Sequence, residues 1–219
     1  MTEDPAPAAA TSAATPASTA AQDQRRVQLL PVLARVFADH GYAGTTTAKL
    51  AAATDLRENQ LYRLWPSKKA MFLAVLGDIA EQQTRWWEEH FEDPRYRDDQ
   101  DHAARAARAI LDDEGKQRGS TGLHRLIFAG LSEAHDPEIR AALQAMYARL
   151  HAYIQRVVKQ QITNNPDACL ASPALCAWSL VALGSFANIA RELDLFPVAT
   201  QRRLFNQLGG ALAGLNPND

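Results

Sequence analysis

Four consecutive polar residues, at positions 57 to 60, have the side chains that proteins use to distinguish the base pairs of DNA. An arginine can donate two parallel hydrogen bonds to guanine, an asparagine or glutamine can pair with adenine, and a glutamate can accept from cytosine N4. A solvated helix start would also be polar, and the sequence does not decide which of the four side chains reach bases. We interpret the run as a base-recognition set that consists of Arg57, Glu58, Asn59 and Gln60.

Two lysines at a predicted helix start indicate contacts of a second kind. The first turn of a helix favours carboxylates, because its unpaired N–H groups and the helix dipole leave a partial positive charge there. Here Ser67 is the predicted cap, and Lys68 and Lys69 follow it. An outside anion such as a phosphate would offset this charge. We therefore predict a phosphate contact by Lys68, and further contacts by the hydroxyls of Thr46, Thr47 and Tyr62.

Two short helices that cross at a corner would position these side chains. The first helix begins with Thr46 or Thr47 as its N-cap and ends with three apolar residues at 50–52. The second carries one apolar stripe of Leu61, Tyr62 and Trp65. Residues 54–56 leave room only for a tight corner. This layout predicts a helix-turn-helix, whose second helix enters the DNA major groove by its first residues.

Three motifs in this region resemble a known family. They are H-G-Y at 40–42, T-T-T-A-K-L-A-A at 45–52 and L-Y-R-L-W-P-S-K-K-A-M-F at 61–72. Together they resemble the N-terminal domain of the TetR family of bacterial transcriptional regulators, over roughly Leu29 to Val75. The resemblance implies a DNA-binding head followed by a helical domain that dimerises and encloses an effector.

Three positions depart from the usual pattern of that family. Asp55 stands where the turn usually has glycine, Arg57 where a small hydroxyl residue is usual, and Trp65 where phenylalanine is usual. Aspartate tolerates a left-handed backbone better than most residues, so we expect the turn to be retained. Arg57 changes the contact expected at the start of the recognition helix, whereas Trp65 retains the packing role.

Charge is distributed unevenly along the chain. The 219 residues are 47% hydrophobic and carry a formal net charge of only -2. Residues 25–72, however, contain eight Lys or Arg against three Asp or Glu, whereas the segments before and after are acidic. The basic residues therefore gather in the helix-turn-helix region, as a local phosphate-binding surface requires.

The first 24 residues have a different composition from the rest. They are dominated by Ala, Thr, Pro and Ser without a periodic apolar stripe, which predicts a disordered arm over 1–24. Glu3 and Asp4 replace the basic start of a signal peptide, and we expect no later run to approach a membrane span. We therefore expect a cytoplasmic protein without a membrane partner. Cys169 and Cys176 fit that compartment as reduced, buried residues.

The remaining pattern is helical throughout. A first helix from Arg25 to His40, ended by Gly41, completes a three-helix head over 25–70; Pro31 either begins its well-formed part or kinks it. An all-α domain of about six helices follows over 71–219, and no segment alternates with period two for long enough to form a sheet. Its helices are predicted from Ser67 to Phe91, Asp98 to Asp113, Leu123 to Ala134, Pro137 to the break at Asn164, Ser172 to Leu193, and after Pro197 to Leu215.

The last two helices mix large apolar residues with very small ones. Glycine inside a helix costs about 1 kcal/mol against alanine, which close approach of a neighbouring helix could offset. In the TetR family the corresponding helices meet their copy as a four-helix bundle, and this resemblance implies a homodimer. Core packing within one subunit is the alternative. The candidate dimer-interface residues are Gly184, Ser185, Ala187, Gly209 and Ala213.

Aromatic and polar residues on the middle helices could line an apolar cavity with a few polar groups. An aromatic stripe at helical spacing is more often core, so this interpretation depends mainly on the family resemblance. The wider set also includes Trp87, Phe91 and Phe186. The candidate effector-pocket residues are Trp86, His90, His124, Phe128, Tyr147, His151 and Trp178.

Catalytic and metal-binding motifs were not found in the sequence. A phosphate-binding loop around Gly115 and Lys116 would need glycine at Ile110 and a hydroxyl residue at Gln117. There is no G-x-S-x-G elbow, and no two histidines stand at a ligand-like spacing in one predicted helix. We expect no catalytic residues, no metal, no cofactor and no enzymatic activity.

The sequence therefore predicts a TetR-like regulator that binds double-stranded DNA. We expect a repressor that binds a palindromic operator as a homodimer and is released by a small apolar or aromatic effector. Two alternatives remain open: an effector-independent DNA-binding regulator of the same fold, and a helical interaction module whose head no longer binds DNA.

Overall fold

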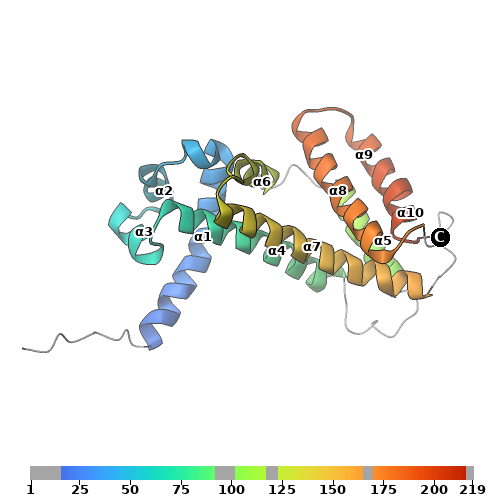
Figure 1. Ribbon diagram of the computed structural model, residues 1–219, viewed down its shortest axis with the longest axis horizontal. Helices are drawn as coiled ribbons and strands as arrows, with labels where there is room; N and C mark the ends of the chain where they lie inside the picture. Colours follow the sequence, from blue (N-terminus) through green and yellow to red (C-terminus); the bar gives the residue numbers. More distant parts are fainter. Residues whose placement is uncertain (1–15, 92–101, 117–122, 165–169, 216–219) are drawn as a thin grey trace, which may run out of the picture.

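The computed structural model describes residues 16–91, 102–116, 123–164 and 170–215, and every regular element within these ranges is a helix. A small head forms one end of the molecule (Figure 1). It consists of α1 (Pro16–Gly44), α2 (Thr47–Thr54) and α3 (Glu58–Leu64). The all-α class and the helix-turn-helix order agree with prediction.

The second part is built on two long helices, α4 (Lys68–Phe91) and α7 (Pro137–Asn164), which lie side by side and lead away from the head (Figure 1). At the end of the molecule away from the head, further helices pack around α7. These are α5 (His102–Lys116), α8 (Pro173–Glu192) and a last helix made of α9 (Val198–Leu204), a five-residue π-helical turn, η3 (Phe205–Gly209), and α10 (Gly210–Leu212). Helix α6 (Leu123–Ser132) lies back against the head, on α1.

The head is held by a core in which its three helices meet α4. Leu33 and Phe37 of α1 and Leu61 of α3 are fully buried there. The Phe37 ring packs edge-on against Phe72 of α4, with 4.9 Å between centroids. The same apolar cluster continues into α6 and α7 through residues such as Leu126 and Ile139, so the head is packed directly onto the second domain.

Helix α1 is longer than predicted. It begins at Pro16, so residues 16–24 are helical and the predicted disordered arm is wrong for them; residues 1–15 lie outside the described ranges. Proline suits a first helical turn, and the alanines and glutamines that follow it are good helix formers. The helix passes through Pro31 and departs from helical geometry at Gly41, where φ is 67°. The predicted break at Gly41 is confirmed.

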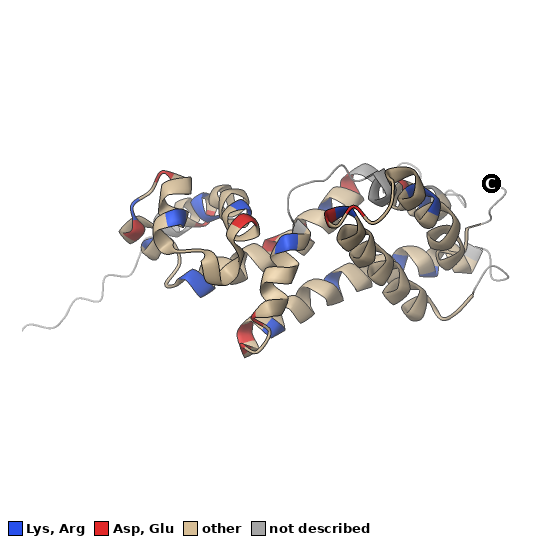
Figure 2. Ribbon diagram, turned by 90° about the horizontal axis from the view of Figure 1, so that it is seen from above, with Lys and Arg blue, Asp and Glu red and all other residues tan. Residues whose placement is uncertain are grey.

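The corner between α2 and α3 has the predicted form. The Thr46 hydroxyl accepts a hydrogen bond from the Lys49 backbone N–H and caps α2. Asp55 ends that helix in the left-handed region, with φ of 53°, and the Leu56 N–H donates to the Ala51 carbonyl at 3.0 Å. Aspartate therefore takes the conformation that glycine would take at this turn. Figure 2 marks the positions of Lys and Arg in blue along the helices of the head.

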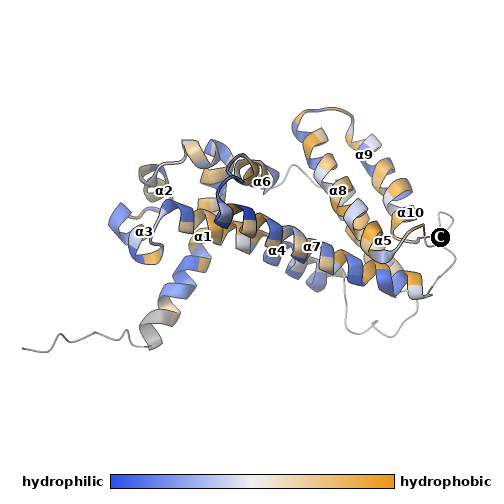
Figure 3. Cartoon of the chain, viewed as in Figure 1, coloured by the Kyte–Doolittle hydropathy of each residue, from blue (hydrophilic) through white to orange (hydrophobic). Residues whose placement is uncertain are grey.

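Helix α8 departs from one expectation. By length and composition it could cross a membrane, since an 18-residue window has a mean hydropathy of 1.5, whereas we expected no such run. Only 33% of that window is buried in the subunit, and much of the helix is hydrophobic along its length (Figure 3). Near its start Cys176 is buried, and its thiol donates to the Ala171 carbonyl at 3.6 Å; Cys169 lies outside the described ranges.

Candidate DNA-binding surface and effector cavity

The start of α3 is exposed on a rigid support. All four residues of the predicted base-recognition set, from Arg57 to Gln60, are exposed. On the opposite face Leu61 and Leu64 are buried in the head core. Helix α3 lies at the end of the molecule away from the second domain (Figure 1). An amphipathic helix held in this way presents its polar first turn outward, as entry into a major groove requires.

Besides its predicted contact with DNA, Gln60 has a structural role at the start of α3. Its Oε1 accepts a hydrogen bond from the Arg57 backbone N–H at 2.8 Å, which closes the first turn of α3. Arg57 occupies the N-cap position, but its guanidinium has only donors and cannot accept from the helix amides. Bidentate pairing with adenine needs the amide oxygen of Gln60 as well as its NH₂ group. While Gln60 caps the helix, only its NH₂ group is available to a base.

The predicted phosphate-contact residues lie near this surface. Thr46 and Tyr62 are exposed, and Thr47 is half-buried in the first turn of α2. The Thr46 hydroxyl already accepts from the Lys49 N–H, so it would meet a phosphate as a donor. These three contacts remain predictions.

The charges at the start of α4 have partners inside the molecule. The Lys68 ammonium donates to the carbonyls of Tyr42 and Thr45 at 3.0 Å each, and it lies 4.3 Å from the centre of the Tyr42 ring. Ser67 caps the helix, as predicted, by accepting from the Ala70 N–H. Backbone carbonyls within the molecule therefore already accept from Lys68. A contact between Lys68 and phosphate remains a prediction.

Lys69 connects the head region to the second domain. Its ammonium lies 2.6 Å from Glu138 Oε1 and 3.2 Å from Asp136 Oδ2, at the start of α7. The hydrogen bond that Lys69 donates to Glu138, followed by the one to Asp136, raises the pKa of Lys69. Burial alone would raise the pKa of Asp136, but the hydrogen bonds from Lys69 and from the Ile139 and Glu138 amides lower it overall.

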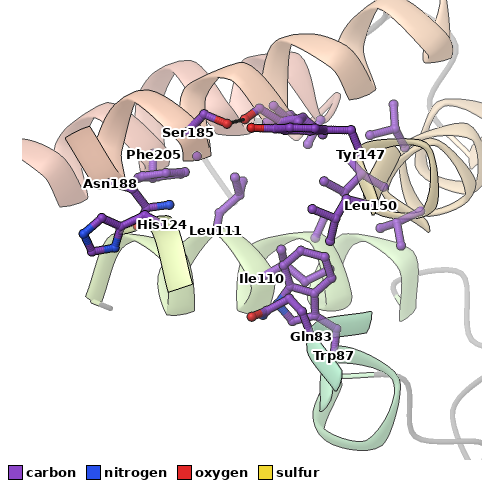
Figure 4. Close-up of a pocket in the computed structure, with 18 of the residues that line it drawn as sticks. Gln83, Trp87, Ile110, Leu111, His124, Tyr147, Leu150, Ser185, Asn188 and Phe205 are labelled. Carbon is purple, nitrogen blue, oxygen red and sulfur yellow. Dashed lines mark hydrogen bonds between the residues drawn. The ribbon is translucent and has the colours of Figure 1, made fainter. Parts of the chain in front are cut away.

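A partly open cavity of about 140 Å³ lies in the second domain and is lined by residues of α4, α5, α6, α7, α8 and the last helix (Figure 4). Its wall is mainly aliphatic, with the rings of Trp87, Tyr147 and Phe205. Polar side chains interrupt that wall at Gln83, His124, Ser185 and Asn188. None of the described residues that line the cavity is Asp, Glu, Lys or Arg. Such a site suits an uncharged, largely apolar molecule.

The candidate effector-pocket residues divide between the cavity and the surface. His124 and Tyr147 line the cavity, as does Trp87 of the wider set. Trp86, Phe128 and Trp178 are instead more than a third exposed and do not line it. His151 stacks on Trp178 with 4.3 Å between ring centres, and the His90 side chain lies outside the description. Sequence reasoning missed Gln83, Asn188, Phe205 and the α5 residues Ile110 and Leu111.

One edge of the cavity is fixed by an ionic group. The Glu192 carboxylate, at the end of α8, lies 2.7 Å from His124 Nε2 and 2.7 Å from the Arg125 guanidinium. The hydrogen bond from His124, followed by that from Arg125, lowers the pKa of Glu192. This group joins α6, which packs against the head, to the end of α8.

The candidate dimer-interface residues differ in burial. Ala187, Gly209 and Ala213 are buried within the subunit, and a Cβ on Gly209 would lie 2.7 Å from Leu111 Cδ2. Gly184 and Ser185 line the cavity. The assignments of Ala187, Gly209 and Ala213 are corrected, because these buried residues pack inside one subunit. Gly184 and Ser185 are half-buried, and their place in a dimer interface remains a prediction. The outer face of α8 instead exposes Leu175, Trp178, Ala182 and Phe186.

Comparisons with known proteins agree with this architecture. Residues 29–75 match the family model described as bacterial regulatory proteins, tetR family. The chain is 26% identical over 164 residues to the nucleoid occlusion factor SlmA of Citrobacter koseri and to that of Klebsiella pneumoniae, and each match covers 74% of this chain and 80% of the relative.

Solved structures share the fold at low identity. A TetR-family regulator from Cytophaga hutchinsonii superposes with a TM-score of 0.67 at 18% identity, over 90% of this chain and 96% of that one. The regulator FadR from Bacillus subtilis, in complex with stearoyl-CoA, gives 0.66 at 13% identity, over 87% and 99%. The chain therefore has the fold of TetR-family DNA-binding regulators.

Proposed function

We propose that the chain is a transcriptional repressor of the TetR family of bacterial regulatory proteins, and that it binds a palindromic DNA operator as a homodimer. In this proposal a small apolar or aromatic effector releases the operator. The matched family and the solved neighbours are transcriptional regulators, and we accordingly expect no enzymatic activity and a cytoplasmic location.

The exposed first turn of α3 carries the DNA-binding part of the proposal. Arg57, Glu58 and Asn59 are exposed at the start of α3. The other face of that helix packs in the core through Leu61 and Leu64. Direct recognition needs side chains of these types on a support that holds their direction. Lys49 and Arg63, both exposed beside them, provide positive charge for the DNA backbone.

The outer face of α8 supports a homodimer. Leu175, Trp178, Ala182 and Phe186 recur at helical spacing, so they form one apolar stripe along the helix. Contiguous apolar surfaces that are exposed to solvent mark interaction sites, and a second copy of the chain offers an identical stripe. Such a dimer would carry two heads, as a palindrome requires.

The cavity supports an effector. Helix α4 runs from Lys68, which holds the α1–α2 connection, to Gln83 and Trp87 in the cavity wall. A ligand that displaces this wall would therefore act on a helix that is fastened to the head. Suppose that the protein has one state that binds DNA and one that does not. To move it almost fully from the first to the second, the ligand must bind the second more tightly by about 5.5 kcal/mol.

A gel-shift experiment tests the DNA-binding proposal. The probe is the DNA upstream of the protein's own coding sequence, with scrambled DNA of the same composition as competitor. We expect wild type and Arg203→Ala, which removes an exposed arginine on α9, to shift the probe equally, and Arg57→Ala with Asn59→Ala to lose the preference over the competitor. Equal binding of all three proteins to both DNAs would reject recognition through α3. Absence of any shift, repeated with DNA selected from random sequence, would favour the interaction-module alternative.

The similarity to a nucleoid occlusion factor favours one alternative function. The name of that relative describes a role at the nucleoid, so an effector-independent DNA-binding protein of this fold is the second candidate. The 140 Å³ cavity favours the effector-responsive form, because protein interiors are ordinarily close-packed and contain few voids larger than a water molecule. Thermal-shift measurement with a panel of uncharged aromatic compounds separates the two, since the second candidate predicts no stabilisation by any of them.

A further inference from the structure

Asn188 has one half of its side-chain amide fixed and the other half available. The Arg191 guanidinium, three residues further along α8, donates from Nη1 to Asn188 Oδ1 at 2.9 Å. A guanidinium has five N–H donors and no acceptor, so only the oxygen of the amide can face it. This contact therefore settles which end of the amide is oxygen and which is nitrogen.

The nitrogen end lies on the cavity side. Asn188 lines the cavity, and Figure 4 shows its side chain extending from α8 toward the Leu111 side chain. Within the described residues no acceptor is found for its two N–H groups. The positive charge of Arg191 behind the amide oxygen also polarises the group and strengthens its N–H donors. The cavity therefore contains a fixed, reinforced hydrogen-bond donor.

The next polar group along the same face is an acceptor. Ser185, one turn earlier on α8, donates its hydroxyl proton to the Val181 carbonyl at 2.9 Å. Its oxygen lone pairs stay available, and residues three apart on a helix are neighbours. Apart from Gln83 and His124, the rest of the wall is aliphatic and aromatic, and none of its described residues is Asp, Glu, Lys or Arg.

We propose that Asn188 determines effector specificity by donating a hydrogen bond to a neutral carbonyl oxygen of an otherwise apolar or aromatic molecule. The class includes ketones, esters and lactones. A carboxylate would bring a full negative charge into a largely apolar cavity that no described Lys or Arg lines, and burial of such a charge is unfavourable. This inference deepens the effector part of the proposed function and rests on it.

Matched ligands test the inference without knowledge of the natural effector. The probes are 1-tetralone, tetralin, which has the same two rings without the oxygen, and 1,2,3,4-tetrahydro-1-naphthoate. Binding to the full chain is followed by quenching of tryptophan fluorescence, since Trp87 lines the cavity, and by calorimetry. We expect wild type to bind 1-tetralone about tenfold more tightly than tetralin, the factor that corresponds to one net hydrogen bond, and to bind the carboxylate most weakly.

Asn188→Asp is the decisive variant. It retains the shape of the side chain and an oxygen for Arg191, but it replaces the N–H donors by a second acceptor. The preference for 1-tetralone over tetralin should fall from about tenfold to one or below. Asn188→Leu, a second variant without polar atoms, should behave alike, whereas the matched control Asn206→Asp, at an exposed position, should retain the wild-type preference.

Several results would overturn the proposal. They are equal binding of the two neutral probes by wild type, an unchanged preference in Asn188→Asp, tightest binding of the carboxylate, or no binding of 1-tetralone up to its solubility limit. Because ligand binding is measured without DNA, a failure here leaves the DNA-binding proposal to its own gel-shift test. Tight ketone binding that does not depend on Asn188 would refute this inference and retain the cavity as an effector site.

Discussion

The ammonium of Lys69, in the first turn of α4, lies 2.6 Å from the carboxylate of Glu138, in the first turn of α7. The residue before it, Lys68, holds the carbonyls of the α1–α2 connection. Two adjacent lysines therefore fasten the start of α4 to different parts of the molecule. A displacement of α7 relative to α4 would therefore shift the start of α4, and with it the α1–α2 connection of the head.

Lys69→Gln should separate effector binding from DNA release. The variant removes the ion pairs to α7 but leaves the cavity residues and the base-recognition set intact. We expect unchanged affinity of the free protein for its operator and a smaller loss of that affinity when 1-tetralone or another cavity ligand is added. Fluorescence anisotropy of labelled operator, with and without ligand, measures both quantities. Full ligand-induced release in the variant would show that the contact does not transmit the change.

The same contact should be insensitive to pH over a wide range. The pKa of Asp136 is lowered from 3.8, so its contribution to stability is complete above that value and is lost only in stronger acid. The pKa of Lys69 is raised from 10.5, so its contribution is complete below that value. The difference in Tm between wild type and Lys69→Gln should therefore stay constant from pH 5 to pH 9, two values chosen well inside these limits. A difference that changes across this interval would contradict the assignment.

Lys68→Met should destabilise the head as well as weaken DNA binding. The substitution leaves the Tyr42 and Thr45 carbonyls without their charged donor, which should cost about 1–3 kcal/mol in the free energy of unfolding by urea. If Lys68 also touches phosphate, the salt slope of operator binding should fall by about 0.9 per contact, twice in a dimer. Stability equal to wild type would show that the intramolecular contacts contribute little. An unchanged slope would remove Lys68 from the phosphate-contact set.

Two helical glycines should respond oppositely to alanine. At Gly209 the added methyl would meet Leu111 at 2.7 Å, and such overpacking should destabilise the subunit by about 1–3 kcal/mol. A Cβ added at Gly184 would have no atom of another part of the structure within 4 Å, and alanine should stabilise the helix by about 0.5–1 kcal/mol. Urea unfolding at fixed protein concentration measures both. Destabilisation by Gly184→Ala would contradict the packing described for α8.

The outer face of α8 should determine the oligomeric state. Phe186→Glu places a charge in the middle of the apolar stripe, and we expect a monomer by sedimentation at micromolar concentration. Val27→Glu, at another exposed apolar position, on α1, is the control and should remain a dimer. A wild-type monomer, or a dimer that persists in Phe186→Glu and in Trp178→Glu, would reject the stripe as the interface.

Local signals along the chain were sufficient to predict the head. Thr46 as a cap, Asp55 in a left-handed turn and Ser67 as the cap of α4 are each set by residues within one helical turn. The apolar spacing of Leu61 and Trp65 likewise predicted two residues that are buried in the head. Such features depend on short-range geometry, so a single sequence contains them.

Features that depend on distant partners could not be predicted. The partners of Lys69 lie 67 and 69 residues away, and no local pattern indicates that they meet the start of α4. Helix α8 is apolar around most of its circumference, and its pattern alone does not distinguish the face that packs inward from the face left exposed. For that reason the small residues near Ala187 and Gly209 were assigned to the wrong surface, and Asn188 was overlooked.

Selection of binding sites from random DNA by the wild-type protein tests the central claim most directly. A dimer that places the two α3 helices in successive turns of the major groove predicts a palindrome whose half-sites have centres about 34–36 Å apart, or about one helical turn of DNA. The selected sites should lose affinity when either half-site is scrambled, and the Arg57→Ala protein should select a relaxed base at one position of each half. Enrichment of a single, non-repeated half-site, or no enrichment above the starting pool, would contradict the account.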